Sequence, residues 1–514
     1  MLNTAFLALQ VFTLVAFFYF RHRKATASLP PGPTPLPFIG NLHQLPPVEP
    51  YKTYASWTER YGPIIYMHLF GREFIVLNQL EDVLNLFEKR SSLYSTKPRL
   101  VMAGELVGRE RTSMLFLKYG PMMQKTRQIV HSWMNPKASK NAYALQELGS
   151  LRTILRILET PDRYAQHIRI TVGSVILKLT YGIDTEPEND PWIQLSESLS
   201  HITAEASKPG RWLVDSFPSM VYIPSWFPGA SWKKWGSDSR TVSMNLVRLP
   251  YQRVKDKLAE GSQDVSWTAS QLAAFGENPT PSEEDALICA AGSLYAGGID
   301  TTTIVIRTFI LMMVRYPEIQ RRAQEDIDRV VGTHRLPNMG DMDSLPYISY
   351  IIKETLRINP LAPVIPHSLD KDDVYKGYRI PKGTWIMANA WAIHHDPTVH
   401  KDPDVFNPSR FETTNGNIPE RDPSILAFGF GRRICPGMHL SQASMFLYIA
   451  HLLFVYEMSP VPDKDGNCIP PPAAYYATHL RYPEHFPCKF TPRSQERVKL
   501  VEDAVANGTH ALGP

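Results

Sequence analysis

The sequence predicts a mainly α-helical fold with a small β-rich part (α+β), and three features of the chain carry this prediction. The longest helical pattern runs from about Ser282 to Tyr316, with Ser282 and Asp285 as a capping box at its start. A second apolar, helix-forming run, Met438 to Phe454, follows a glycine-rich loop. Only Ile64 to Phe70 and Glu73 to Asn78 have a strand-like pattern, and most of the remainder is helical.

Changes in composition mark four parts of the 514-residue chain, which is longer than one hydrophobic core usually allows. Residues 1–24 are apolar and then basic, and residues 25–50 are rich in proline. Residues 51–495 are expected to form one main domain, and residues 496–514 a polar, loosely held tail. The proline-rich part is expected to be a stiff, extended connector.

The N-terminal part has the pattern of a membrane anchor. Leu2 to Phe20 is almost wholly apolar, close to the ~20 residues that span a bilayer core, and the basic cluster Arg21 to Lys24 follows at once. A cleaved signal peptide is the alternative, but its positive charges would precede the apolar run. Because trailing positive charge stays in the cytosol, we expect a single uncleaved transmembrane helix with the bulk of the protein cytosolic.

Charge and cysteine content argue against two other classes of protein. A formal net charge of +4 without a long basic stripe gives no reason to expect a nucleic-acid partner. None of the four cysteines, Cys289, Cys435, Cys468 and Cys488, stands in a C-x-x-C pair, so no zinc site is expected. Cys468 and Cys488 could pair in principle, although so few cysteines suit a reducing compartment better.

An aromatic-rich stretch lies between two helical regions, at residues 209–235. It contains Trp212, Trp226, Phe227, Trp232 and Trp235. Ordinary core packing is one interpretation of this stretch. Together with an N-terminal anchor, a second membrane contact near a substrate entrance is the other, and the sequence leaves both open.

The most informative segment is the string F-G-F-G-R-R-I-C-P-G, which places Cys435 in a glycine-rich loop before an apolar helix. Gly429, Gly431 and Gly437 allow positive φ and the close approach of a flat ligand. Pro436 suits the first position of a helix, so Cys435 would lie at the helix N-terminus, where the dipole favours a thiolate. A buried structural cysteine in a turn is the alternative, but the spacing favours a thiolate ligand of haem iron.

This string resembles the haem-binding loop of the cytochrome P450 family, F-x-x-G-x-R-x-C-x-G. Every defined position matches: Phe428, Gly431, Arg433, Cys435 and Gly437. The resemblance implies the cytochrome P450 fold, with haem b between a long distal helix and the proximal cysteine loop. It also implies that Cys435 binds the iron and that Arg433 pairs with a haem propionate.

The long helical pattern carries A-G-G-I-D-T-T in its middle. Two adjacent glycines in a buried helix cost roughly 1 kcal/mol each relative to alanine, so we expect a flat cofactor and a small molecule to use the space at Gly297 and Gly298. The P450 helix over the distal haem face carries the same G-G-x-[DE]-T-T pattern. The resemblance implies that Asp300 and Thr301 organise water and deliver protons to dioxygen there.

Glu354 and Arg357 form an E-x-x-R pair on one face of a predicted helix. Such a pair is usually solvated, but the apolar neighbours from Tyr347 to Ile352 favour burial. P450s join these two residues to an arginine in a P-x-R-F segment, a position that Arg410 holds. The resemblance therefore implies a structural role for all three residues.

Two further residues are implied to contact haem propionates. The family's Y-G-x-x-W-x-x-x-R segment corresponds to Tyr119 to Arg127, which assigns Arg127 to a propionate. Met123 stands where the family has tryptophan, so one propionate hydrogen bond is in doubt and a thioether can pack the haem edge instead. His367 is another propionate candidate, with a histidine that caps a strand as the alternative.

These features predict an NADPH- and O2-dependent haem-thiolate monooxygenase, monomeric and anchored in the endoplasmic reticulum membrane. It would oxidise a small, largely apolar metabolite of terpenoid, polyketide or indole type. Phrases such as P-G-R-W-L-V-D and W-F-P-G-A resemble fungal membrane-bound members of secondary metabolism. Because no G-x-G-x-x-G nucleotide motif is present, electrons would come through a separate NADPH-cytochrome reductase, with cytochrome b5 as a further donor.

Three alternatives stay open from the sequence. An O2-independent isomerase or dehydratase of the same family is one, although Asp300 and Thr301 argue against it. A non-catalytic haem sensor or carrier is the second, and a helical scaffold without a cofactor is the third.

Overall fold

The structure of the protein is a computed structural model that describes residues 29–262, 265–276, 279–413, 416 and 418–511. The predicted membrane anchor, residues 1–24, lies outside the described residues. The chain divides into two compact units. The first comprises the N-terminal part to residue 98 with residues 364–393 and 431–433, and the second comprises the rest.

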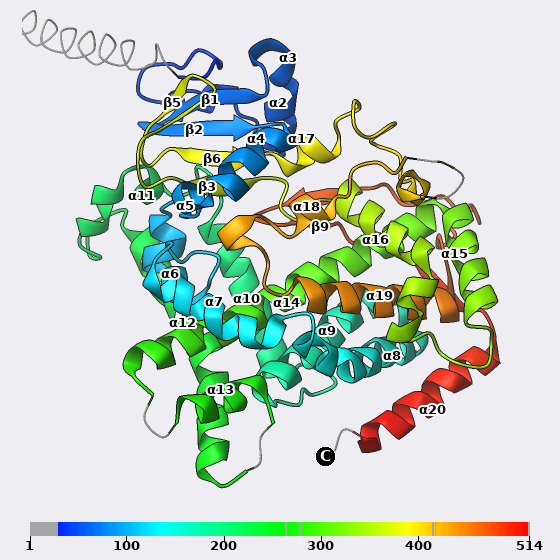
Figure 1. Ribbon diagram of the computed structural model, residues 1–514. Helices are drawn as coiled ribbons and strands as arrows, with labels where there is room; N and C mark the ends of the chain where they lie inside the picture. Colours follow the sequence, from blue (N-terminus) through cyan, green and yellow to red (C-terminus); the bar gives the residue numbers. More distant parts are fainter. Residues whose placement is uncertain (1–28, 263–264, 277–278, 414–415, 417, 512–514) are drawn as a thin grey trace, which may run out of the picture. The chain divides into compact units, whose positions relative to one another are not determined.

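The first unit is built on a four-stranded sheet with the strand order β1-β2-β6-β3 (Figure 1). Its strands are β1 (Ile64–Leu69), β2 (Arg72–Leu77), β6 (Trp385–Ala388) and β3 (Ile365–Ser368). The β2–β6 pair is parallel and the other two pairs are antiparallel. The two strands predicted from sequence are therefore confirmed to within one residue at each end, whereas the short β3 and β6 had no clear sequence signal.

Short helices and one hairpin complete the first unit. They are η1 (Leu42–Gln44), α2 (Pro50–Ser56), α3 (Thr58–Tyr61), α4 (Leu80–Val83), the π-helical η2 (Leu84–Lys89), α5 (Ser91–Tyr94), the antiparallel pair β4 (Asp373–Tyr375) and β5 (Tyr378–Ile380), α17 (Ala390–His394) and η9 (Gly431–Arg433).

The proline-rich connector is tied to the sheet of the first unit. The backbone N–H of Tyr66 donates to the Pro31 carbonyl over 2.9 Å, and that of Asn41 donates to the His68 carbonyl over 2.7 Å. The Asn41 side chain in turn accepts from the His68 N–H at 2.8 Å. Much of the connector therefore lies along β1.

The second unit is helical and centres on α14 (Pro281–Arg315). This helix packs against α9 (Tyr164–Tyr181), α7 (Pro121–Met134), α12 (Ser231–Ala259) and α19 (Met438–Val455) (Figure 1). The long helix predicted from sequence is confirmed, but its capping box is Thr280 with Glu283, two residues before the predicted one. Pro281 at the first helical position makes the earlier start favourable.

The other elements of the second unit surround this centre. They are the π-helical η3 (Val101–Leu106), α6 (Arg109–Thr112), η4 (Ala138–Ala142), α8 (Tyr143–Glu159), η5 (Pro161–Arg163), α10 (Pro191–Ala206), α11 (Leu213–Ser216), η6 (Pro218–Tyr222), α13 (Trp267–Phe275), α15 (Pro317–Val330), η7 (Met339–Ser344), α16 (Pro346–Ile358), η8 (Pro408–Phe411), α18 (Ser424–Ala427), β7 (Tyr456–Ser459), β8 (Tyr475–Ala477), β9 (Arg481–Pro483), β10 (Lys489–Pro492) and α20 (Gln495–Ala511). Strand β7 pairs with β10 and β8 with β9, both antiparallel.

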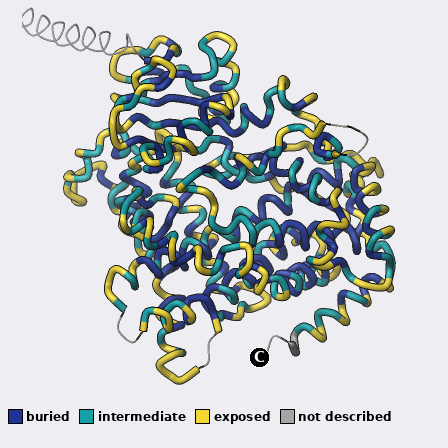
Figure 2. Tube along the Cα trace, in the orientation of Figure 1, coloured by how far each residue is buried: buried dark blue, intermediate teal, exposed yellow. Residues whose placement is uncertain are grey.

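Helices α14 and α19 form the core of the second unit, and their residues are mostly buried (Figure 2). Within the described residues they are the two helices long and apolar enough to cross a membrane, and about four-fifths of the apolar window of each is buried in protein, 78% in both cases. Their hydrophobicity is thus accounted for by core packing.

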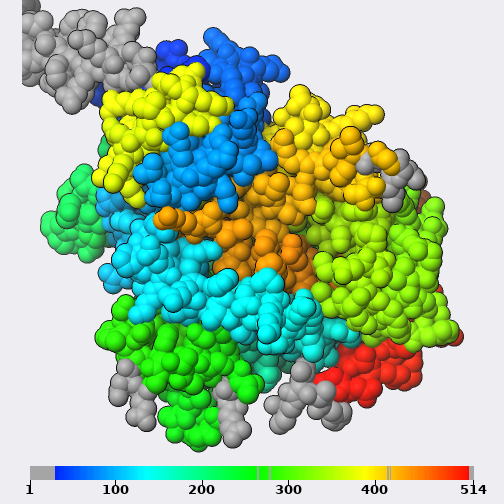
Figure 3. Space-filling model, in the orientation of Figure 1, coloured from blue at the N-terminus to red at the C-terminus, as the bar shows by residue number. Residues whose placement is uncertain are grey.

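The C-terminal tail is helical, so the prediction of a loosely held tail is wrong. Helix α20 packs against α8 and forms part of the surface (Figure 3). Val498 and Val501 on this helix are buried, and Arg497 donates to Asp328 over 2.8 Å. The polar composition of the tail concealed an apolar stripe with helical spacing.

The aromatic stretch of residues 209–235 is partly buried in the core and partly exposed. Trp212 and Trp235 stack with ring centroids 4.7 Å apart, and with Trp232 they pack on a buried cluster that includes Val101. Other apolar side chains of the stretch face outward: Leu213, Phe217, Tyr222, Trp226 and Phe227 are 46–85% exposed. One part is therefore core, and the other is an exposed apolar surface.

Candidate active site

The cysteine loop is closed by a backbone hydrogen bond from the N–H of Cys435 to the carbonyl of Phe428, 2.6 Å long. Gly429 and Gly431 adopt the positive φ that was predicted, 74° and 47°. At Gly431 the requirement is also steric, because a Cβ there would lie 2.7 Å from the carbonyl oxygen of Phe87. Only glycine satisfies both conditions.

The prediction for the other end of the loop needs correction. Gly437 has φ −84°, so it needs no special backbone freedom. It is the N-cap of α19, which begins at Met438, and Pro436 therefore precedes the helix instead of starting it. A Cβ on Gly437 would lie 4.0 Å from Sγ of Cys435, an ordinary contact.

The Cys435 thiol is accessible, yet it has protein on most sides. Burial raises its pKa, and the opposing effects of a hydrogen bond from the Gly437 backbone and of the Arg127 charge do not outweigh burial. The Gly437 backbone and Arg127 therefore do not by themselves offset the effect of burial on a charged thiolate. A coordinated metal ion would supply the missing charge, since a coordinating thiol is deprotonated outright.

Arg127 and Met123 lie on α7, one helical turn apart. The guanidinium of Arg127 donates from Nη1 to the carbonyl oxygen of Ile434 over 2.8 Å, directly before Cys435. Met123 is buried. The structure thus brings Arg127 to the cysteine loop, while its contact with a propionate stays a prediction.

His367 lies inside β3, so it does not cap a strand. Its Nδ1 donates to the carbonyl of Tyr94 over 2.6 Å, and its ring stacks on Phe87 at 4.1 Å. Burial, with smaller contributions from the charges of Lys97 and Arg433, holds the pKa of His367 well below 6.5. In a neutral imidazole whose proton is on Nδ1, the Nε2 atom is a hydrogen-bond acceptor.

Lys97 and Arg433 both lie in the first unit. No sequence motif pointed to Lys97. Lys97 Nζ donates to the Pro366 carbonyl over 3.0 Å, and Arg433 Nε donates to the Ser95 carbonyl over 2.6 Å. Burial and the nearby Arg433 charge lower the pKa of Lys97 to about 7. Two cations so close together favour an anion beside them.

The middle of α14 opens at a single glycine. Gly297 is exposed although most of the helix is buried, and a Cβ there would meet no described heavy atom within 4 Å. At Gly298, by contrast, a Cβ would lie 2.9 Å from the Ile176 side chain of α9. Of the two glycines expected to provide space, Gly297 does so, and Gly298 lets α9 approach.

The two polar residues that follow have different surroundings. Thr301 is partly exposed, and its hydroxyl donates to the Gly297 carbonyl over 2.8 Å. Asp300 is buried, and its Oδ1 accepts from Nη1 of Arg169 on α9 over 2.6 Å. Sequence reasoning missed Arg169, because it lies 131 residues from its partner along the chain.

These features fit a haem with a thiolate ligand. In the second unit an accessible thiol and an open helix segment offer an iron ligand and room for a flat ring. In the first unit Lys97 and Arg433 offer positive charge for carboxylates. Among the residues that the structure describes, no group of three or more His, Cys, Asp and Glu side chains could hold a metal ion by itself.

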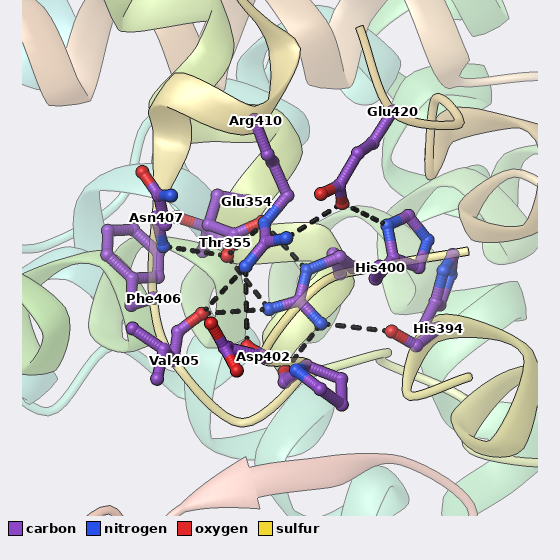
Figure 4. A network of polar contacts seen from close by, with 12 residues as sticks. Glu354, Thr355, His394, His400, Asp402, Val405, Phe406, Asn407, Arg410 and Glu420 are labelled. Carbon is purple, nitrogen blue, oxygen red and sulfur yellow. Dashed lines mark hydrogen bonds and ion pairs between the residues drawn. The ribbon is translucent and has the colours of Figure 1, made fainter. Parts of the chain in front are cut away.

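The E-x-x-R pair is buried and joined to Arg410, as the sequence predicts (Figure 4). Glu354 accepts from Nε and Nη2 of Arg357, both at 2.8 Å, and from Nε of Arg410 at 3.1 Å. A further bond comes from the backbone N–H of Asn407 at 2.8 Å. The three side-chain contacts are buried, and the backbone contact is partly buried.

A second carboxylate, which the sequence did not reveal, balances the charge of this cluster. Glu420 accepts from Nη1 of Arg410 over 2.7 Å and from Nδ1 of His400 over 2.8 Å (Figure 4). The guanidinium of Arg357 also donates to the His394 and Pro403 carbonyls at 2.9 and 2.7 Å. Two guanidiniums thus meet two carboxylates, and backbone carbonyls take most of the remaining donors.

Comparison with known proteins agrees with this geometry. The model of the cytochrome P450 family matches residues 30–479. Cytochrome P450 monooxygenase claR of Ampulloclitocybe clavipes is 40% identical over 484 residues, which cover 93% of this chain and 89% of that protein. Cytochrome P450 monooxygenase 208 of Postia placenta is 36% identical over 96% of both chains.

Tryptamine 4-monooxygenase of Psilocybe cyanescens is 37% identical over 493 residues, which cover 94% of this chain and 97% of that protein. All three relatives are fungal, and the family match over residues 30–479 includes the cysteine loop, α14 and the Glu354 cluster. The chain therefore belongs to the cytochrome P450 family, whose members carry a haem iron, and it is an oxidoreductase of the monooxygenase class.

Proposed function

We propose that this P450 inserts one oxygen atom from O2 into a small, largely apolar secondary metabolite, with electrons from NADPH. One observation carries the proposal: a buried helix opens at Gly297, next to the hydroxyl of Thr301. An apolar molecule can approach the backbone there while a hydroxyl group stays beside it. Terpenoid, polyketide and indole substrates are all compatible, and the tryptamine named for the Psilocybe relative supports the indole type.

We assign haem b to the residues described above. Cys435 would bind the iron, while Arg127, Arg433 and Lys97 would face the propionates; His367 would join them only with a second proton on Nε2, because its Nδ1 already donates to the Tyr94 carbonyl. When bound, a haem iron with a thiolate ligand supplies reductive activation of O2 and transfer of one oxygen atom to carbon.

Thr301 and Asp300 would manage protons beside the open segment. The Thr301 hydroxyl uses its proton on the Gly297 carbonyl, so its oxygen can accept a hydrogen bond from a water molecule. Arg169 holds the Asp300 carboxylate one residue earlier on the helix. A water positioned by Thr301 is a proton source in an otherwise apolar space.

We further propose that the enzyme is a monomer held in the endoplasmic reticulum membrane by a single N-terminal helix, with its folded part in the cytosol. Electrons would come from a separate NADPH-cytochrome reductase, with cytochrome b5 as a further donor. The exposed apolar side chains between residues 213 and 227 would form a second membrane contact, because Tyr222 and Trp226 are 85% and 79% exposed.

The test uses full-length enzyme in vesicles with a fungal reductase. Indole, a sesquiterpene hydrocarbon and an anthraquinone serve as probes, and the low-spin to high-spin shift of the haem reports binding. A probe that binds is then turned over under 18O2. The proposal expects one labelled oxygen atom in the product and a strict need for NADPH. Product without NADPH would favour the isomerase or dehydratase, and binding of a probe without any product would favour a sensor.

A further inference from the structure

Arg109, on the short helix α6, is a buried cation without an acidic partner. Only 4% of its surface is exposed. Its Nη1 donates to the neutral hydroxyl of Thr112 over 3.1 Å, and its buried Nε has no hydrogen-bond partner among the described residues. The aromatic ring of Phe116 lies 5.8 Å from the guanidinium carbon, a weak additional contact.

Arg109 receives no negative charge from the protein around it. Within the described chain no carboxylate forms an ion pair with this guanidinium. The nearest ionisable group that acts on it is the thiol of Cys289, and burial raises the pKa of that thiol to about 12. Cys289 is therefore neutral at physiological pH and cannot serve as a counter-ion. A buried, unpaired guanidinium is strongly unfavourable unless a ligand supplies the anion.

The surroundings of Arg109 place it near the open part of α14. The imidazole of His479, between β8 and β9, is influenced by both Arg109 and Asp300. Burial lowers the pKa of His479 to about 4, so this side chain is a neutral hydrogen-bond donor at physiological pH. The position of α6 is given by its contact with α14: a Cβ on Gly292 would lie 3.6 Å from the Thr112 carbonyl oxygen, and the Met114 N–H donates to Ser293 Oγ over 2.8 Å, one helical turn before Gly297.

A surface cavity beside Arg109 also has an excess of positive charge. It has a volume of about 510 Å³ and touches Gly108, the residue directly before Arg109. Its charged lining residues are Arg99, Arg111, Lys118 and Arg240, together with Glu105 and Glu110. The net positive field favours the approach of anions.

We propose that Arg109 binds a carboxylate of the substrate, so that the enzyme oxidises an apolar molecule that carries one acid group. This inference rests on the proposed function, in which the space beside α14 receives the substrate. Arg109 acts here as a specificity-determining residue, and His479 can donate a second hydrogen bond to the same anion. A cationic amine, such as the substrate named for the Psilocybe relative, is disfavoured at this position.

The helix gives an approximate length for the substrate. Helix α6 meets α14 at Gly292, five residues before Gly297. At 1.5 Å per residue the separation along the helix axis is about 7.5 Å. The acid group is thus expected more than one helical turn from the carbon that is oxidised, and a medium-length chain or a fused-ring skeleton spans that distance.

The test compares three probes with the same ten-carbon chain: decanoate, decan-1-ol and decyltrimethylammonium, whose quaternary nitrogen cannot bind iron. Dissociation constants are measured by equilibrium dialysis and by the spin shift of the haem. In Arg109→Gln the constant for decanoate should rise at least about tenfold, while that for decan-1-ol should stay within about twofold. Arg109→Lys should recover part of the decanoate affinity, and the parent should bind the quaternary cation most weakly.

Arg253→Gln is the matched control, because Arg253 is an exposed arginine on α12 that does not line the cavity beside Gly108. It should leave decanoate binding within about twofold at moderate salt. The proposal is overturned if Arg109→Gln, with full haem content, weakens both probes equally or neither of them. If Arg109→Gln does not fold, equal affinity of the parent for decanoate and for the quaternary cation overturns it. Failure of the proposed function has a separate signature: the parent would form no oxygenated product with NADPH and O2, whereas dialysis reports binding at Arg109 independently.

Discussion

Oε1 of Glu354 lies 3.1 Å from Nε of Arg410, although 56 residues separate the two along the chain. Neither side chain is exposed by more than 2%. The same carboxylate also holds Arg357 and the backbone of Asn407. The contact therefore joins α16 to the segment that leads toward the cysteine loop, and its charges have no access to water.

Glu354→Ala should consequently give little haem-loaded protein. Removal of Glu354 takes the carboxylate from Arg357 and leaves Arg410 with Glu420 alone. Loss of one partner of a buried ion pair typically costs about 3–5 kcal/mol. The measurement is haem content per protein together with the apparent thermal midpoint. Lys353→Ala is the control on the same helix, because its ion pair with Asp422 is 33% and 39% exposed and should contribute at most about 1 kcal/mol. Equal stability of the two variants would show that the cluster is unimportant for folding.

Thr301→Ala should retain haem and bind substrate, but waste reducing equivalents. Without the hydroxyl beside the open segment at Gly297, a proton-donating water loses its acceptor. We expect more hydrogen peroxide and less product for each NADPH consumed. Thr303→Ala is the control, since that hydroxyl is buried and has no described hydrogen-bond partner. If Thr301→Ala and the parent couple NADPH to product equally well, Thr301 is a packing residue.

His451 should make the protein less stable as the pH falls. It is fully buried, with Nδ1 accepting from Ser150 at 2.8 Å and Nε2 donating to the Pro337 carbonyl at 2.9 Å. Burial lowers its pKa to about 4, whereas an unfolded histidine has a pKa near 6.5. Between these values the unfolded state binds the proton more readily, so stability falls as the pH drops from about 6.5 to about 4.

His451 changes the free energy of unfolding by at most about 1.4 kcal/mol per pH unit between these two pKa values. Urea midpoints at pH 7 and pH 5 for the parent and His451→Gln test this effect. The variant should have the shallower pH dependence, although buried His367 and His394 keep some of it. An unchanged dependence would mean that the folded and the unfolded state bind a proton at His451 equally well.

Deletion of residues 2–24 should weaken membrane association and leave the haem spectrum intact. The proposed anchor precedes the connector, which is bound to β1 by its own hydrogen bonds. Flotation of the protein with vesicles measures association, and exposed residues such as Trp226 should retain part of it. A mature N-terminus found downstream of Lys24 would instead identify a cleaved signal.

Local sequence patterns were enough to predict the long core helices and the first two strands. A long helical pattern located α14, a continuous apolar run after the glycine-rich loop located α19, and the N-terminal strands appeared within one residue of their positions. Short strands such as β3 and β6 were missed, because four residues carry little periodic information. Helix α20 was missed because its buried valines are few among polar residues.

The site shows the same division between local and long-range information. The cysteine loop, Arg127 and the Glu354 contacts follow from short motifs. Lys97 and Arg169 do not, because their importance comes from neighbours that are distant in the sequence. The pKa of the Cys435 thiol also depends on long-range packing, because burial raises it more than the Gly437 backbone and the Arg127 charge lower it.

The central claim is that Cys435 is the sole protein ligand of a haem iron, and the reduced carbon monoxide complex tests it most directly. Cys435→His should lose the thiolate-type Soret band of that complex, because imidazole is a neutral and weaker electron donor. Cys468→Ser, which changes an exposed free cysteine, should keep the band. Persistence of the thiolate band in Cys435→His would contradict the assignment of the ligand and the proposed function with it.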